Sequence, residues 1–170
     1  MSASANKLRD AVAADAAAIA AIYNHYVATT VISMESDPVG PSEMTRRIAE
    51  VQDAALPWLV LEEDGAVLGY AYASKWRARP GYRHAVESSV YVDAGLRGRG
   101  IGLTLYRALI ARLTGRFHCV IGGIALPNPA SVALHERLGF CQVACFKEVG
   151  HKFGNWVDVA YWQLQLLPMD

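Results

Sequence analysis

The chain has 170 residues, of which 53% are hydrophobic and 19% are charged, so residues 1–170 are taken as one domain with a full core. Its 16 basic and 16 acidic side chains cancel, which argues against a nucleic-acid-binding protein, because such proteins carry a basic excess. No apolar run reaches the roughly 20 residues of a membrane span, and the first ten residues lack the layout of a secretory signal, so we expect a cytoplasmic protein.

The first half of the chain predicts a strand, two helices and a hairpin. The expected elements are a strand over Lys7–Val12, one helix beginning after Asp15 and another after Pro41-Ser42, and antiparallel strands over Trp58–Glu62 and Ala66–Ser74. The helices are indicated by apolar residues that recur at helical spacing. The two strands are separated by Glu63-Asp64-Gly65, which is typical of a hairpin turn.

The second half predicts strands that alternate with helices. The expected elements are strands over Ala85–Val92, Val120–Ala125, Gln142–Val149 and Val157–Leu166, a helix through Ile101, Leu105, Leu109 and Leu113, and a helix over Asn128–Leu138. Gly139 stands where a glycine usually ends a helix. Because a hairpin is combined with crossover units, the sequence predicts an α/β or α+β fold with a mixed sheet.

A glycine-rich loop before the first of these helices is the most informative stretch. Glycines stand at positions 95, 98, 100 and 102, with Arg97 and Arg99 between them. Free N–H groups at a helix start attract anions, glycines let the backbone approach, and arginines suit phosphate oxygens. A Walker loop is excluded because Ile101 follows Gly100, and the spacing does not match a dinucleotide fingerprint either.

Two motifs in this half resemble those of the GNAT acetyltransferase superfamily. Arg97-x-x-Gly100-x-Gly102 is similar to the signature that holds the pyrophosphate of acetyl-CoA. The segment 128–140 is similar to the superfamily's Asn-x-x-Ser-x-x-x-(Tyr/His)-x-x-x-Gly-Phe helix, and one apolar strand separates the two motifs, as it does there. The resemblance implies a bent, mixed sheet of about seven strands with about four helices, whose central strands splay to admit the pantetheine arm.

Four further segments resemble the phosphinothricin and methionine sulfoximine N-acetyltransferases, so the resemblance covers nearly the whole chain. These segments are Ile22–Val27, Ser33–Glu35, Val86–Val92 and Val149–Asp158. The resemblance implies acetyl-CoA as acetyl donor, a small amino-acid-like acceptor and a homodimer. It places contacts to acetyl-CoA on Val90, Tyr91, Val92, Arg97, Gly98, Arg99, Gly100, Ile101, Gly102, Leu103, Asn128 and Ser131.

Two carboxylates and one histidine are candidates for the chemistry. A free amine is mostly protonated at pH 7, so acetyl transfer to it needs a base. Glu87 lies in an apolar strand, where partial burial would raise its pKa toward the working range, although it could instead pair with an arginine. Glu35 is the rival base, or positions the substrate. His135 stands where many superfamily members carry a tyrosine that protonates the departing thiolate, and could equally be a polar residue that is merely near the cofactor.

Two loops are candidates for binding the acceptor. The loop 75–84 carries five basic side chains and two aromatic ones, and we expect Arg77, Gly81, Tyr82 and Arg83 to recognise a carboxylate and an anionic side group. A solvated basic loop would have the same composition. Lys152, Phe153 and Trp156 lie on the last hairpin, which in the resembling group borders the substrate pocket across a dimer interface.

The sequence therefore predicts an acetyl-CoA-dependent N-acetyltransferase that transfers the acetyl group directly to the amine of a small amino acid or analogue. No metal is expected, because no histidine completes a metal set with the cysteines, which we expect to be reduced thiols. One alternative is a protein or peptide N-acetyltransferase, which would favour a wide acidic groove. The other is a non-catalytic acyl-CoA-binding sensor, which would not need Glu87.

Overall fold

The computed structural model describes residues 6–166, which form four α-helices and seven strands. The helices are α1 (Ala16–Thr29), α2 (Pro41–Asp53), α3 (Ile101–Leu113) and α4 (Pro129–Arg137). The strands are β1 (Lys7–Asp10), β2 (Trp58–Glu63), β3 (Ala66–Lys75), β4 (Ala85–Val92), β5 (Cys119–Ala125), β6 (Cys141–Lys152) and β7 (Asn155–Gln165). The order and type of these elements confirm the expectations from the sequence.

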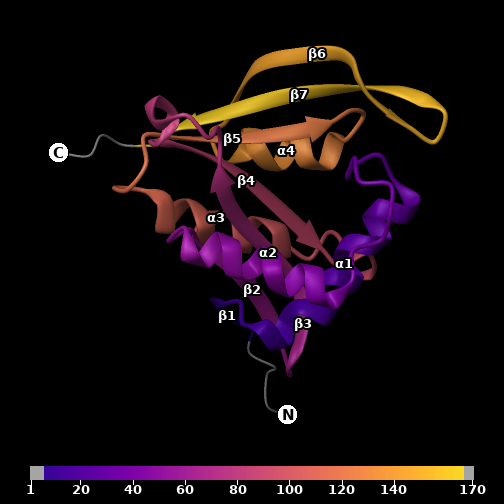
Figure 1. The fold of residues 1–170 in the computed structure, drawn as a ribbon, viewed down its shortest axis with the longest axis vertical. Helices are drawn as coiled ribbons and strands as arrows, with labels where there is room; N and C mark the ends of the chain where they lie inside the picture. The colour runs from indigo at the N-terminus through magenta and orange to yellow at the C-terminus, as the bar shows by residue number, and fades with distance from the viewer. Residues whose placement is uncertain (1–5, 167–170) are drawn as a thin grey trace.

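The strands form one mixed sheet in the order β1-β2-β3-β4-β5-β7-β6. All neighbouring strands are antiparallel except β4 and β5, which are parallel and joined by the crossover through α3. The β6–β7 hairpin extends beyond the rest of the sheet (Figure 1). The predicted mixed sheet of about seven strands with about four helices is confirmed.

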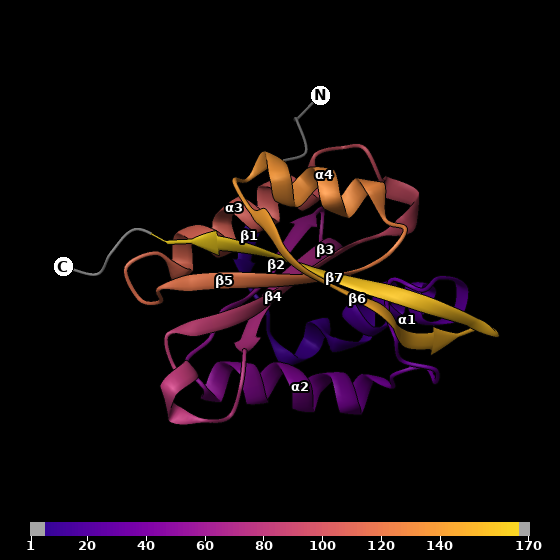
Figure 2. The ribbon, with the colours of Figure 1, turned by 90° about the horizontal axis from the view of Figure 1, so that it is seen from above.

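Helices cover both faces of the sheet, with α3 and α4 on one face and α1 and α2 on the other (Figure 2). Ile19 and Tyr70 are almost fully buried on the α1–α2 face, and Leu105 and Leu109 are fully buried on the face under α3. Burial of each such side chain contributes roughly 1.5–3 kcal/mol. None of the helices within residues 6–166 is long and apolar enough to cross a bilayer.

Local turn chemistry agrees with the sequence at three places. Asp64 and Gly65 have φ angles of 51° and 81°, as a tight hairpin turn between β2 and β3 requires. The side chain of Asn128 caps α4 by accepting a hydrogen bond from the Ser131 amide at 3.1 Å. Gly139 follows this helix with φ 90°, the left-handed conformation in which helices often end.

Two local features differ from simple expectation. The strand β6 continues to Lys152, past the expected end at Val149, because its register shifts between Phe146 and Gly150 and so interrupts the alternation of apolar residues. Asp15 precedes α1, but its carboxylate makes two hydrogen bonds to Arg9, at 2.7 and 2.8 Å, and does not cap the helix.

The strands β4 and β5 pair over only three residues each before they diverge (Figure 1). The last pair joins Glu87 to Ile121, whereas β4 continues to Val92 and β5 to Ala125. Beyond this pair, backbone N–H and C=O groups on the facing edges have no ladder partner across the gap. The sheet therefore contains a polar opening at its centre, and the candidate site is built around it.

Candidate active site

A cavity of about 50 Å³ lies in the opening between β4 and β5. Its lining residues are Ile32, Ser88, Ser89, Val90, Tyr91, Gly123, Ile124, Ala125, Asn128, Ser131 and His135. Successive residues of a strand point to opposite faces, so Ser88 lines the cavity from the α3–α4 face and Ser89 from the α1–α2 face. The cavity therefore passes through the sheet and joins its two faces.

On the α3–α4 face, a chain of hydrogen bonds links three buried side chains. The Ser88 hydroxyl lies 2.6 Å from the Tyr106 hydroxyl, which lies 2.9 Å from Nε2 of His135. Nδ1 of His135 lies 2.7 Å from the Ser131 carbonyl, which can only accept, so Nδ1 carries the proton. Nε2 is therefore the acceptor of the Tyr106 hydroxyl proton. Burial lowers the pKa of His135, which keeps the imidazole neutral at pH 7.

On the α1–α2 face, Glu87 stands beside the opening. A Cβ placed on Gly123, which lines the cavity, would lie 3.4 Å from Oε1 of Glu87. Burial raises the pKa of Glu87, and the positive charge of Arg77 opposes that rise. A half-buried carboxylate with a raised pKa is suited to accept a proton near neutral pH.

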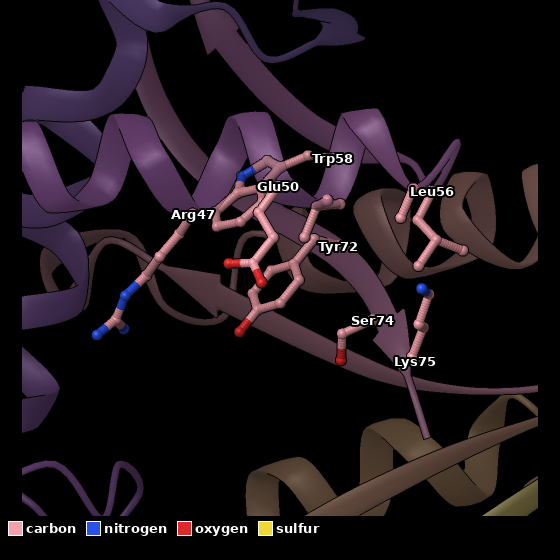
Figure 3. A pocket seen from close by; sticks show the side chains of 9 residues that line it. Arg47, Glu50, Leu56, Trp58, Tyr72, Ser74 and Lys75 are labelled. Carbon is pink, nitrogen blue, oxygen red and sulfur yellow. The ribbon is translucent and has the colours of Figure 1, made fainter. Parts of the chain in front are cut away.

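A larger cavity of about 400 Å³ lies on the same face, between α2 and the strands β2 and β3 (Figure 3). Its lining residues are Arg47, Glu50, Val51, Ala54, Leu56, Trp58, Tyr72, Ser74 and Lys75. The rings of Trp58 and Tyr72 stack with their centres 4.2 Å apart, and Arg47 and Lys75 lie toward opposite ends (Figure 3). Tyr72 pairs with Ser89 across the β3–β4 ladder, so this cavity is next to the opening in the sheet.

Glu35, the second candidate base, is engaged with α2. Its Oε1 lies 2.6 Å from Nη1 of Arg47, and the same arginine lies 2.9 Å from Glu43. The carboxylate of Glu35 is thus held at the end of the larger cavity, and the structure does not place it in the small cavity.

The predicted phosphate-binding loop is shaped by left-handed glycines. Gly98 and Gly100 have φ angles of 81° and 78°, and a Cβ on either would meet no atom within 4 Å. The first hydrogen bond of α3 runs from the Thr104 amide to the Gly100 carbonyl, so the amides of residues 101–103 precede it and face outward at the helix start. Arg97 lies 5.4 Å above the Tyr26 ring, and Arg99 lies 3.6 Å from Glu63.

The other predicted contacts to acetyl-CoA divide into backbone and side-chain positions. The ring of Tyr91 packs in the aromatic cluster of the α1–α2 face. A ligand can therefore contact the backbone at Val90, Tyr91 and Val92. Ile101 is buried, and Gly102 and Leu103 are half-buried in the first turn of α3.

The predicted acceptor loop is only partly brought to the site. The Arg77 guanidinium lies 4.9 Å from the centre of the Trp76 ring, and the Trp76 and Tyr161 rings pack edge to face with their centres 5.6 Å apart. The charge of Arg77 is near enough to Glu87 to lower the pKa of that carboxyl. The residues Gly81, Tyr82 and Arg83 belong to or follow an exposed turn, in which Arg83 bonds the Pro80 carbonyl at 3.3 Å.

The predicted residues of the last hairpin have two different environments. Phe153 and Trp156 are 57% and 65% exposed, which is unusual for aromatic side chains. Lys152 differs from the expectation of a direct substrate contact, because its ammonium group is buried and bonds the carbonyls of Val27 and Ser33 in its own chain.

Comparison with known protein families identifies the family of this chain. A family model described as an acetyltransferase (GNAT) domain matches residues 8–161. The chain belongs to the GNAT acetyltransferase family.

Similar proteins cover almost all of this GNAT chain. A phosphinothricin N-acetyltransferase from Streptomyces viridochromogenes is 41% identical over 158 residues, which are 92% of this chain and 86% of that protein. An L-methionine sulfoximine/L-methionine sulfone acetyltransferase from Salmonella typhimurium is 42% identical and covers 94% of both chains. The solved structure of a phosphinothricin acetyltransferase from Sinorhizobium meliloti in complex with acetyl-CoA superposes with a TM-score of 0.91, at 41% identity over 95% of this chain and 88% of that one.

Three residues of this GNAT site are not assigned by the sequence analysis: Ser88, Tyr106 and Arg47. Tyr106 offered a signal, because a hydroxyl in the apolar stripe of α3 must find a partner when it is buried. Ser88 lies in a strand with other polar residues, and Arg47 in a charged helix, so neither stands out. Residues 6–166 contain no group of three or more side chains arranged to hold a metal, and Cys119, Cys141 and Cys145 are free thiols.

Proposed function

We propose that this GNAT enzyme transfers the acetyl group of acetyl-CoA directly to the amino group of a small amino acid or analogue, of the phosphinothricin, methionine sulfoximine or methionine sulfone type. This proposal rests mainly on the cavity through the sheet. Glu87, whose pKa is raised by burial, lies on one face of the cavity, and the hydrogen-bond chain that includes His135 lies on the other. The names of the similar proteins support this acceptor class. We place the enzyme in the cytoplasm.

A panel of acceptors tests this function. Release of free CoA from acetyl-CoA is measured with methionine sulfoximine, methionine sulfone, phosphinothricin, common amino acids and a set of short peptides. Turnover with the amino-acid analogues is expected. Turnover with peptides alone would indicate a peptide N-acetyltransferase, and binding of acetyl-CoA without any turnover would indicate a sensor.

The start of α3 is suited to hold the pyrophosphate of acetyl-CoA. The free amides and the positive end of the helix dipole favour an anion, and Arg97 and Arg99 add exposed positive charge. The unpaired edge of β4 after Glu87 can bond the pantetheine arm, and amides near Val90–Val92 can polarise the thioester carbonyl. Asn128 and Ser131 approach the arm from α4.

Gly100→Ala is expected to weaken acetyl-CoA binding by about tenfold or more, because a Cβ here separates the phosphate from at least one amide donor. The calorimetric Kd for acetyl-CoA measures the effect. The matched control is Gly115→Ala, which has the same φ of 78° and equally open surroundings, but lies about 20 Å away beyond the other end of α3. Equal losses of affinity in both variants would contradict the assigned phosphate loop.

Arg77 is the best placed of the predicted acceptor residues. Arg77→Ala is expected to raise the KM for the amino acid by about tenfold, the effect of one charge-assisted bond, and to leave the KM for acetyl-CoA unchanged. Arg77 lowers the pKa of Glu87, so its removal should also move the acidic limb of the kcat/KM profile to higher pH. Arg79→Ala, in the same exposed loop, is the control that should change neither quantity.

The β6–β7 hairpin supports a homodimer. It exposes five large apolar side chains, each more than half exposed: Val143, Phe146, Val149, Phe153 and Trp156. A surface of this kind usually marks an interaction site. The resemblance to the phosphinothricin and methionine sulfoximine N-acetyltransferases implies that this hairpin borders the acceptor pocket across the dimer interface.

Light scattering at micromolar concentration is expected to give twice the chain mass of 18.5 kDa. Phe146→Ser combined with Trp156→Ser should give the monomer mass, because it removes two of the largest apolar contacts. Tyr82→Ser is the control, since Tyr82 is also exposed but belongs to the turn Pro80–Tyr82 and not to the hairpin. A monomeric wild-type protein would exclude this pairing.

A further inference from the structure

The ammonium group of Lys152 is buried between the β6–β7 hairpin and the segment that follows α1. Lys152 is only 5% exposed, and its Nζ donates to the Val27 carbonyl at 2.7 Å and to the Ser33 carbonyl at 2.6 Å. Both acceptors are more than 100 residues away along the chain. The side chain therefore joins the last hairpin to the N-terminal part of the fold.

The two carbonyls belong to the beginning and the end of one short segment. Val27 lies in the last turn of α1, where carbonyls lack an intrahelical partner and a positive charge is favourable. Ser33 lies in the loop before α2. By bonding both, Lys152 fixes the direction in which the chain leaves α1.

This loop, residues 30–35, reaches both cavities of the site. Ile32 lines the small cavity through the sheet. Glu35 bonds Arg47, which stands at one end of the larger cavity (Figure 3). Between them, the Ser33 hydroxyl lies 2.8 Å from the Tyr23 hydroxyl and accepts the Glu35 amide at 3.2 Å.

The hairpin is also shaped to receive this loop. A Cβ on Gly150 would lie 2.5 Å from the terminal methyl of Met34, so Met34 packs directly over Gly150. The loop is thus seated on the hairpin by an apolar contact at Met34 and by the ammonium group of Lys152.

We propose that Lys152 is a positioning residue for the acceptor site, which holds loop 30–35 so that Ile32 and Glu35 stand at the two cavities. A lysine buried for packing alone would be costly, because a charged group loses its hydration unless strong acceptors replace it. The carbonyls of Val27 and Ser33 replace the lost hydration of the ammonium group, and their bonds to Lys152 hold both carbonyls in place. The part of this proposal that concerns catalysis rests on the proposed function.

The test compares Lys152→Met with Lys152→Arg and Lys147→Met. Methionine keeps the apolar stem but removes the donor, whereas arginine retains donors for two carbonyls. Lys147 lies on the same strand, is exposed and pairs with Asp158, so its loss changes the hairpin charge without touching the loop. Three quantities are measured: hydrogen exchange of the amides of residues 30–35, the calorimetric Kd for acetyl-CoA, and the KM and kcat for methionine sulfone.

Lys152→Met should speed amide exchange within residues 30–35 and raise the KM for methionine sulfone by about tenfold, while the Kd for acetyl-CoA stays unchanged. Lys152→Arg should restore most of both losses, and Lys147→Met should resemble the wild type. Unchanged amide exchange in loop 30–35, or a parallel loss of acetyl-CoA affinity, would overturn the proposal.

The arginine variant keeps the proposal testable if Lys152→Met does not fold. Wild-type amide exchange and a wild-type KM in Lys152→Arg would then support the proposal, whereas fast amide exchange in Lys152→Arg would overturn it. Absence of turnover in the wild type would refute the proposed function. Hydrogen exchange would then still test whether Lys152 holds loop 30–35.

Discussion

Glu87→Gln is expected to lower kcat at pH 7 by about 10²–10⁴-fold, the usual effect of removing a general base. Glutamine keeps the size of the side chain beside Gly123 but cannot take the proton of the amine. Steady-state rates with saturating acetyl-CoA and the best acceptor of the panel measure the change. The fold and the affinity for acetyl-CoA should be retained, because Glu87 lies on the sheet face opposite α3 and α4.

The pH profile gives an independent test of Glu87. Burial raises the pKa of this carboxyl, and the base acts only when ionised, so wild-type kcat/KM should rise with pH through that raised pKa. In Glu87→Gln this limb is lost, and activity should recover partly at high pH, where the amine loses its proton to solvent. Glu35→Gln is the control and should act mainly on KM, because Glu35 is bound to Arg47. Near-normal kcat in Glu87→Gln would transfer the role of base to another group.

Tyr106→Phe is expected to lower kcat by about 10²-fold, at the lower end of effects for acid–base groups, with little change in acetyl-CoA affinity. Neutral His135 has no proton on Nε2, so it can protonate the departing thiolate only after Nε2 gains one, and the Tyr106 hydroxyl is bonded there. The variant removes this link between Ser88 and His135. Single-turnover rates measured against pH detect the loss.

The same variant should also lower the stability of the protein. Nε2 of His135 loses its buried partner, which costs about 1–3 kcal/mol and lowers Tm by several degrees, whereas the Ser88 hydroxyl can still donate to the Ile121 carbonyl at 3.4 Å. Tyr70→Phe is the matched control, since it removes a hydroxyl from a buried tyrosine on the other face of the sheet. A Tyr106→Phe enzyme with normal kcat but reduced Tm would give Tyr106 a purely structural role.

Parts of the site encoded within one segment could be predicted from the sequence. The loop before α3 and the segment 128–139, which contains α4, combine turn residues, caps and helical spacing within a few positions, so local rules identify them. Glu87 is recognisable as a carboxylate in an apolar strand, and because the side chains of a strand alternate, it lies on the same face as Ser89.

Parts of the site that depend on distant contacts could not be predicted. Lys152 resembles an exposed loop lysine in sequence, and only the packing of the hairpin on loop 30–35 buries it. Arg47 belongs to a helix with three nearby acidic residues, and nothing local singles out Glu35, across a turn, as its partner. Tyr106 and His135 are 29 residues apart and meet only because α3 and α4 lie on the same face of the sheet.

Under the proposed function, the passage through the sheet separates the routes of the two substrates. The acetyl donor would be held from the α3–α4 face and the amine would arrive from the α1–α2 face, so the two substrates need not displace each other. Both can be bound at the same time, and the acetyl group can move between them without resting on the protein. CoA and the acetylated product can then leave by separate routes, so an excess of one product need not block the entrance used by the other substrate.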